Sequence, residues 1–326
     1  MKAVWRKRGL VAWLLLPAAA LFGALVAARR SAYRAGWLES VRIGVPVVVV
    51  GNIAAGGSGK TPVVLALVQQ LAARGRRPGI VSRGYGGNAA GVREVAKDDG
   101  ADLVGDEPLL LKHRSGCPVF VGRDRVAAAR ALLAAYPDCD VIVSDDGLQH
   151  YRLARDVEIA VVDRQLIANH WMQPAGPCRE PPSRLARVDA VVKNGDGEIV
   201  VHGVPTFEMT IAGGRFLRLG SEESRDADEF GGLRLHAVAG IGVPERFFGH
   251  LAALGVRCET HAFPDHHRYV ASDLDFTGDA VLATEKDAVK LQGLSPLPVW
   301  VLPVDARIEP DLAAFVMEKL DGRPPA

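Results

Sequence analysis

The sequence predicts an α/β protein with two α/β domains, the first built on a parallel sheet. Short apolar runs rich in valine and isoleucine alternate with helix-patterned segments between residues 46 and 200. These runs are continuous, as expected for strands buried on both faces of a parallel sheet. A second alternation of the same kind begins after residue 233, and 326 residues are enough for two hydrophobic cores.

In the first domain we expect strands at 46–50, 79–81, 119–121, 141–143, 159–162 and 190–192, with helices at 61–73 and 123–136. Residues 206–219 form two short segments around Ala212-Gly213-Gly214, which indicates a hairpin. In the second domain we expect strands at 235–238, 257–262, 280–283 and 299–302, with helices at 244–254 and 311–320. The predicted division is an N-terminal helix at 1–35, a phosphate-loop domain at 36–205, a connecting hairpin at 206–232 and a second α/β domain at 233–326.

Residues 9–28 form an uncharged apolar run of twenty residues, which as a helix would be about 30 Å long, close to the thickness of a bilayer core. Three membrane-related interpretations compete: a span, a signal peptide, and a helix that lies in the cytosolic face. A buried helix of the globular fold is the fourth. Trp5 and Trp13 suit a headgroup region, so we expect a membrane-attached helix, with spanning and interfacial placement both open. The basic flanks are Lys2, Arg6, Lys7 and Arg8 before the run and Arg29, Arg30 and Arg34 after it.

The overall composition excludes several classes of protein. There are 39 basic and 38 acidic residues, for a net charge of +1, which argues against general nucleic-acid binding. The four cysteines are scattered without a Cys-x-x-Cys pair, so neither a disulfide framework nor a cysteine zinc site is expected. No obligate protein partner is evident.

A glycine-rich segment follows the first expected strand, because residues 51–62 are GNIAAGGSGKTP. A buried strand that leads through such a turn into a helix presents backbone N–H groups to an anion, which predicts a phosphate-binding loop. Lys60 adds a charge for the β- and γ-phosphate oxygens, and the Thr61 hydroxyl can bind Mg²⁺. Position 54 is alanine where the usual spacing has glycine, so glycines 56, 57 and 59 are expected to form the turn. The residues expected to bind the nucleotide are Asn52, Gly56, Gly57, Ser58, Gly59, Lys60 and Thr61.

Two aspartates end a later expected strand, in the segment VIVSDDG at 141–147. A carboxylate at the C-terminal edge of the sheet, beside the phosphate loop, is where Mg²⁺ needs oxygen ligands. We therefore expect Asp145 or Asp146 to bind metal; a helix cap or Asx-turn is the alternative for one of the pair.

Three further charged segments leave more than one interpretation open. Asp106 and Glu107 in GDEP precede a helical stretch, and from spacing alone helix capping is favoured. The segment FPDHHRY at 263–269 suits a metal ligand set, a general base or a plain polar loop. Arg179 and Glu180 lie in a proline-rich loop, where an arginine either meets phosphate or caps the surface.

A series of unusual motifs gives the whole chain a close resemblance to one family. In order they are GN-x4-GSGKTP, SRGYGG, GDEPLLL, SDDGLQH, GPCREPPSRL-x-RVDAVV, FPDHH and TEKDAVK. The set resembles the tetraacyldisaccharide 4′-kinases, the lipid A 4′-kinases of Gram-negative bacteria. The resemblance implies a kinase at the cytoplasmic face of the inner membrane that uses ATP and Mg²⁺. Its implied substrate is the 4′-hydroxyl of a tetraacylated glucosamine disaccharide 1-phosphate, and its phosphate loop does not require glycine at position 54.

The same resemblance implies roles for individual residues. Asp106 matches the family's catalytic aspartate and His266 the histidine that pairs with it, with the adjacent His267 as the alternative. The other matches are Asp145 and Asp146 as Mg²⁺ carboxylates, either of which can be the direct ligand, and Arg179 and Glu180 as active-site residues near the metal and phosphates.

A membrane-attached regulatory or targeting ATPase is the alternative from a different functional class. The phosphate loop, the strand-end carboxylates and the apolar helix fit it equally well. It does not predict a histidine cluster in the second domain combined with GDEP.

Overall fold

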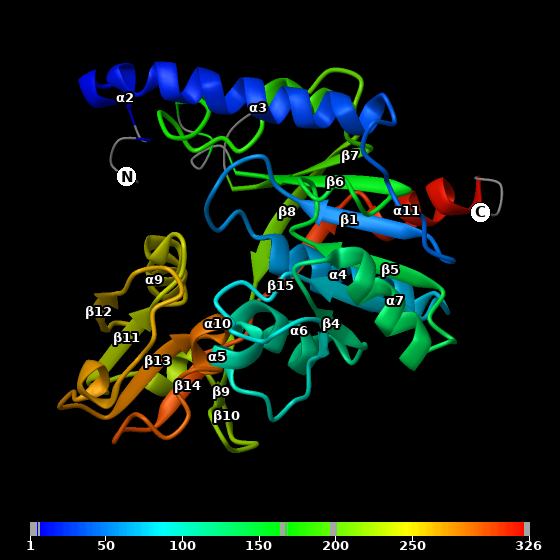
Figure 1. The fold of residues 1–326 in the computed structure, drawn as a ribbon. Helices are drawn as coiled ribbons and strands as arrows, with labels where there is room; N and C mark the ends of the chain where they lie inside the picture. The colour runs from blue at the N-terminus through cyan, green and yellow to red at the C-terminus, as the bar shows by residue number, and fades with distance from the viewer. Residues whose placement is uncertain (1–4, 6, 164–166, 168, 196–200, 323–326) are drawn as a thin grey trace.

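The computed structural model describes residues 5, 7–163, 167, 169–195 and 201–322, so Lys2 and Arg6 of the basic flank lie outside the described residues. The chain forms two sheets, each flanked by helices (Figure 1). This confirms the α/β class and the mostly parallel character of the first sheet.

The first sheet has nine strands in the order β15-β8-β7-β6-β1-β5-β2-β4-β3. All neighbouring pairs are parallel except β15 with β8 and β3 with β4. The strand bounds are β1 Val47–Gly51, β2 Pro78–Ser82, β3 Arg93–Glu94, β4 Val119–Val121, β5 Val141–Asp145, β6 Val157–Val162, β7 Ala190–Asn194, β8 Thr206–Ala212 and β15 Asp305–Glu309.

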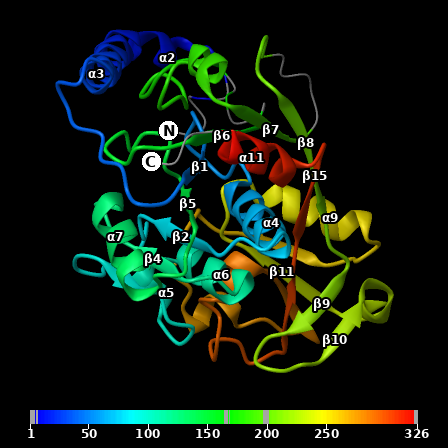
Figure 2. The same ribbon diagram turned by 90° about the vertical axis from the view of Figure 1, so that its right-hand side faces the viewer.

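Helices cover both faces of this sheet, which explains the unbroken valine run of β1. Val48 and Val50 pack into the core under α4 (Lys60–Ala73), α6 (Asp106–Ser115) and α11 (Leu312–Asp321). Val47 and Val49 point into the opposite core, with α7 (Arg125–Ala135). Successive side chains of a strand point to opposite faces, so a strand between two cores must be apolar at every position. Figure 2 shows α4 and α11 on the same side of the sheet.

The second sheet has six strands in the order β10-β9-β14-β13-β11-β12. The four strands β14, β13, β11 and β12 pair in parallel, and β9 and β10 add an antiparallel edge. The bounds are β9 Arg215–Arg218, β10 Ser224–Asp226, β11 Leu235–Ala239, β12 Glu259–Ala262, β13 Ala280–Thr284 and β14 Val299–Leu302, with helices α9 Pro244–Ala253 and α10 Glu285–Ala288.

The connection between the sheets differs from the predicted hairpin at 206–219. β8 pairs with β7 and β15 in the first sheet, whereas β9 pairs with β14 and β10 in the second. Gly213 lies between β8 and β9, and a side chain there would collide with the carbonyl of Pro303 in the connection from β14 to β15. Gly213 therefore allows the connection from β8 to β9 to lie close to the connection from β14 to β15. Gly213 and Gly214 do not form the tight turn of a hairpin.

The C-terminal segment also differs from the predicted division. β15 adds to β8, and α11 contributes Leu312 and Val316 to the core beneath α4. Residues 305–321, assigned from sequence to the second domain, thus pair and pack with the first sheet. Periodicity identified this strand and helix as elements of α/β type but carries no information on which sheet they join.

The N-terminal segment forms two consecutive helices, α2 (Leu10–Leu14) and α3 (Leu16–Arg34), along one side of the first sheet (Figure 1). Ala12 and Ala19 are buried, Trp13 packs edge-on against Trp171, and Tyr33 contacts Tyr151. Across the described part of the chain, no helix combines the length and apolarity that crossing a bilayer would require. The opposite face of the pair is apolar and exposed, at Leu10, Val11, Leu14, Leu21 and Leu25, and Trp13 is also more than half exposed.

Candidate functional site

The segment after β1 folds as the glycine-rich turn that the sequence predicts. Gly56 and Gly59 have positive φ angles of 124° and 86°, which favour glycine. The Asn52 side-chain amide donates to Ser58 Oγ at 3.0 Å, and Asn194 Nδ2 donates to the Ser58 carbonyl at 2.9 Å. A Cβ at Gly59 would come within 2.5 Å of Asn194 Nδ2. The turn is thus held by two amide side chains, Asn52 directly after β1 and Asn194 at the end of β7.

The structure explains why alanine is tolerated at position 54. Ala54 forms an antiparallel bridge with Cys178, and the Ile53 carbonyl accepts a hydrogen bond from the Arg179 backbone at 2.7 Å. Asn52, Ile53 and Ala54 are buried, and no residue from Asn52 to Ala55 has a positive φ, so no left-handed residue is needed until Gly56.

Lys60 and Thr61 begin α4. The N-cap residue of this helix is Gly59, which has no side chain to cap it, so the N–H groups of its first turn suit an anion. Lys60 is buried, and its ammonium lies 3.7 Å from Asp146 Oδ1. A cation held over the start of a helix is what a polyphosphate requires.

Asp145 ends β5 in register with Val50, directly beside the strand that leads into the loop. One of its oxygens accepts from Ser82 Oγ at 3.1 Å; among the described residues no hydrogen-bond donor reaches the other, which is buried. Burial raises the pKa of Asp145, and the negative charges of Glu107 and Asp146 raise it further. A buried carboxylate with a free oxygen beside a second carboxylate fits a divalent cation.

Asp146 follows with a positive φ of 49° and faces two cations. Arg179 Nη1 donates to Asp146 Oδ2 at 3.0 Å, and Lys60 lies on the other oxygen. Burial opposes ionisation of Asp146, but the charges of Lys60, Arg179 and Arg125 outweigh it and lower its pKa. The Oδ1 atom of each carboxyl is buried without a hydrogen-bond donor in the described part of the chain, but only Asp146 forms ion pairs there, with Lys60 and Arg179.

Glu180 is fully buried and its carboxylate is already occupied. It accepts from Gln149 Nε2 at 2.8 Å and from Tyr151 Oη at 2.6 Å, and Arg184 lies 3.4 Å away. The same Gln149 amide donates to the Asn52 carbonyl at 3.0 Å. Glu180 thus connects to the base of the phosphate loop through Gln149.

Asp106 and His266 meet although 160 residues separate them. Asp106 is the first residue of α6, after Gly105 with φ 94°. His266 Nδ1 lies 3.0 Å from both carboxylate oxygens of Asp106, and the exposed Tyr85 ring packs on the imidazole with 4.9 Å between centroids. His267 instead contacts Asp273 at 2.9 Å. Of the two candidate histidines, the structure brings His266 to Asp106.

Two lysines that sequence reasoning did not single out complete this second cluster. Lys290 Nζ lies 3.4 Å from Asp106 Oδ2, and Lys286 Nζ lies 3.0 Å from Glu107 Oε1 and 3.3 Å from Asp265 Oδ1. Burial alone would raise the pKa of Asp106, but the hydrogen bond with His266 and the charges of Lys286, His266 and Lys290 lower it to about 2. Asp106 is therefore a carboxylate throughout the physiological pH range.

The spacing of these two lysines in the sequence could have indicated that they lie close together. Positions 286 and 290 are four residues apart directly after the expected strand at 280–283, and that spacing places both side chains on one face of a helical turn. Arg125 was also missed: its guanidinium is buried and donates to the carbonyls of Gly122 and Asp145. No spacing rule points to this residue.

A parallel α/β sheet whose central strand leads into this loop, beside a strand-end carboxylate pair, defines a P-loop protein. A family model described as tetraacyldisaccharide-1-P 4′-kinase matches residues 11–321. The tetraacyldisaccharide 4′-kinase of Azoarcus sp. (strain BH72) is 56% identical, over 99% of this chain and 96% of the relative. That of Dechloromonas aromatica (strain RCB) is 52% identical, over 98% and 95%.

The fold comparison agrees with the sequence comparisons. A crystal structure of LpxK from Aquifex aeolicus in complex with ATP superposes with a TM-score of 0.83 at 30% identity, covering 95% of this chain and 100% of the other. The chain belongs to the tetraacyldisaccharide-1-P 4′-kinase family, as its motifs predict.

The Asp106 cluster should make stability depend on pH in acid. The pKa of Asp106 is lowered from 3.8 to about 2 on folding, so its ionisation stabilises the fold above about pH 4 and this contribution disappears as pH falls towards 2. The shift corresponds to about 2 kcal/mol. Urea unfolding of wild type and Asp106→Asn should give a stability difference that shrinks between pH 4 and 2. Asp98→Asn, at an exposed carboxyl, is the control; a constant Asp106→Asn difference would refute the pairing.

Proposed function

We propose that this chain transfers the γ-phosphoryl group of ATP to the 4′-hydroxyl of a tetraacylated glucosamine disaccharide 1-phosphate. Family membership supports the reaction class, and the ATP complex of the Aquifex aeolicus relative supports the donor. The observation that carries the proposal is the contact between Asp106 and His266, which a phosphate loop used only for hydrolysis would not require.

In this proposal Asn52, Gly56, Gly57, Ser58, Gly59, Lys60 and Thr61 bind the triphosphate. Asp145, Asp146 and Thr61 would hold Mg²⁺, which when bound neutralises charge on the β- and γ-phosphate oxygens. The free buried oxygen of Asp145 supports it as the direct ligand, since Asp146 already faces Lys60 and Arg179. Arg179 then shares its charge between Asp146 and the phosphates.

Asp106 is proposed as the acceptor of the hydroxyl proton. A sugar hydroxyl is too weak an acid to ionise beforehand, so a carboxylate that takes its proton late in a loose transition state is sufficient. With a pKa of about 2, Asp106 is a weak base that is always ionised, which suits orientation of the hydroxyl more than full deprotonation. His266 and Lys290 hold the carboxylate in place, and Lys286 fixes Glu107 beside it.

Glu180 enters the proposal as a positioning residue. Its oxygens are taken by Gln149 and Tyr151, and Gln149 contacts the backbone of Asn52. It therefore acts on the nucleotide through the first residues of the phosphate loop.

The exposed apolar face of α2 and α3 supports attachment of the protein to the inner-membrane surface, where an acylated substrate resides. Leu14, Leu21 and Leu25 share this face at spacings of seven and four residues and are 71%, 64% and 61% exposed. Basic side chains, Lys7 and Arg8 before the run and Arg29 and Arg34 after it, suit anionic headgroups.

The activity is tested by ATP turnover with and without the acylated disaccharide 1-phosphate in detergent. We expect turnover that depends on the disaccharide and places phosphate at the 4′ position. Lys60→Ala should lose roughly 100-fold in kcat, because it removes a charge that stabilises the transferred group. Lys97→Ala, at an exposed lysine, is the matched control. Disaccharide-independent hydrolysis at the full rate would favour the membrane-attached ATPase instead.

Substitutions in the second cluster should separate chemistry from nucleotide binding. Asp106→Ala is expected to lower kcat by roughly 10² to 10⁴ with nearly unchanged ATP affinity, since Asp106 faces the acceptor. His266→Ala should lower kcat less. His267→Ala should have the smallest effect, because its partner is Asp273. ATP affinity comes from equilibrium titration; weaker ATP binding at unchanged kcat would contradict the assignment.

Membrane attachment is tested with the triple variant Leu14→Glu, Leu21→Glu, Leu25→Glu. Removing three apolar contacts should weaken sedimentation with anionic vesicles and lower kcat/KM for vesicle-embedded substrate by about tenfold or more. ATP affinity should stay unchanged. Leu217→Glu, at an exposed leucine of β9, is the control. Equal sedimentation of the triple variant and this control would rule out the helix face as the attachment.

A further inference from the structure

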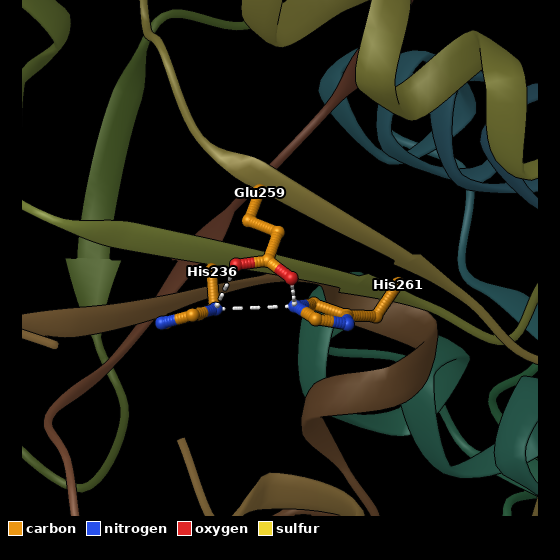
Figure 3. Close-up of side chains that lie close together, drawn as sticks. All are labelled: His236, Glu259 and His261. Carbon is orange, nitrogen blue, oxygen red and sulfur yellow. Dashed lines mark hydrogen bonds and ion pairs between the residues drawn. The ribbon is translucent and has the colours of Figure 1, made fainter. Parts of the chain in front are cut away.

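Outside the kinase site, three side chains that can bind a metal converge on one face of the second sheet (Figure 3). His236 on β11 lies directly opposite Glu259 on the parallel edge strand β12, and His261 follows two residues after Glu259. Register partners, and residues two apart on a strand, share a face of the sheet. The backbone pairing alone therefore brings the three side chains together.

The distances between their donor atoms match the edges of a coordination polyhedron. His236 Nδ1 and His261 Nε2 are 3.1 Å apart, and the Glu259 oxygens lie 3.7 Å from His236 Nδ1 and 3.9 Å from His261 Nε2. Zinc bonds to nitrogen of about 2.0–2.1 Å in a tetrahedron imply ligand separations of about 3.3 Å. Movements of half an ångström or so would give all three donors the spacing of a zinc site.

The orientation of His236 also suits a metal ligand. Its Nε2 lies 3.4 Å from the carbonyl of Thr277, which can only accept a hydrogen bond. The proton therefore belongs on Nε2, and the lone pair of Nδ1 points into the cluster. This is how metal-bound histidines are oriented by their outer hydrogen bonds. Phe276 stacks on both imidazoles at centroid distances of 4.5 and 4.3 Å and fixes their planes.

The cluster is closed on the sheet side and open to solvent on the other. His236 has an 11% exposed side chain and His261 a 23% exposed one, whereas Glu259 is 69% exposed. An ion can enter past Glu259, and water can take the fourth coordination position. Two imidazoles and one carboxylate favour a borderline transition-metal ion over Mg²⁺, which prefers oxygen ligands.

We propose that His236, Glu259 and His261 form a binding site for a divalent transition-metal ion of the Zn²⁺ class. The site is separate from the carboxylates beside the phosphate loop and shares no residue with the Asp106 cluster. A bound ion would cross-link the edge strand β12 to β11. Since β12 ends at Ala262, just before the segment that carries His266, the ion would hold the start of that segment.

The test is a Zn²⁺ titration of the full chain, freed of metal with a chelator and kept in excess Mg²⁺ so that oxygen-rich sites are filled. We expect one equivalent of Zn²⁺ to bind. His236→Gln and His261→Gln should each weaken the affinity at least about tenfold, because each removes one of three protein ligands. His202→Gln, at an exposed histidine, should bind as wild type does. Zn²⁺ binding that is unchanged in both ligand variants would overturn the proposal.

Cobalt provides a second readout that does not depend on stability. Co²⁺ in wild type should give the intense visible absorption of a tetrahedral site, and this band should disappear in His261→Gln and weaken in Glu259→Gln. Thermal unfolding without metal identifies any variant that is simply misfolded, and only variants that unfold like wild type are compared. Absence of the band in wild type, with no Zn²⁺ bound, would show that the two histidines only hydrogen-bond to each other.

Discussion

The hydrogen bond between His266, in the loop after β12, and Asp106, at the start of α6, joins the two halves of the molecule at the candidate site. The backbone around His266 is fixed by a buried carboxylate, Asp287. It accepts from the Gly240 amide at 3.0 Å and from Thr284 Oγ1 at 2.7 Å, and the Gly240 carbonyl in turn accepts from the His266 amide at 3.1 Å. A buried charge of this kind holds the loop only while every partner is present. The position of His266 relative to Asp106 therefore depends on hydrogen bonds within the second domain, those of Asp287 and Gly240.

The first turn of α6 joins the two charged clusters. Asp106 faces His266 and Lys290, while the next residue, Glu107, faces Lys286 and its charge helps to raise the pKa of Asp145. Asp145, which we propose as a ligand of Mg²⁺, and Asp106, which we propose to face the acceptor hydroxyl, are thus both influenced by the same short segment. A cation bound at Asp145 would change the electrostatic potential at Asp106 and Glu107, and this effect requires no movement of the chain.

Much of this was predictable because it follows from local chemistry. Continuous valine runs identify strands that are buried on both faces, and the chemistry of Gly56–Lys60 together with the strand-end position of Asp145 predicts a phosphate site next to carboxylates at one sheet edge. The errors concern information that is not local. Whether the strand after Gly214 pairs back with β8 or joins another sheet depends on β14, far along the chain, and α11 could be identified as a helix but not assigned to its sheet. The spacing of Lys286 and Lys290 would have allowed their proximity to be predicted. The buried position of Arg125 could be seen only in the structure.

The return of β15 and α11 to the first sheet has a consequence for biosynthesis. The sheet that carries the phosphate loop leaves β8 as an open edge, and α4 lacks Leu312 and Val316 beneath it, until residues 305–321 have left the ribosome. The second sheet, by contrast, is complete once β14 has emerged. The domain translated first is thus the one finished last, and its unpaired edge is exposed to other nascent chains throughout translation of the second.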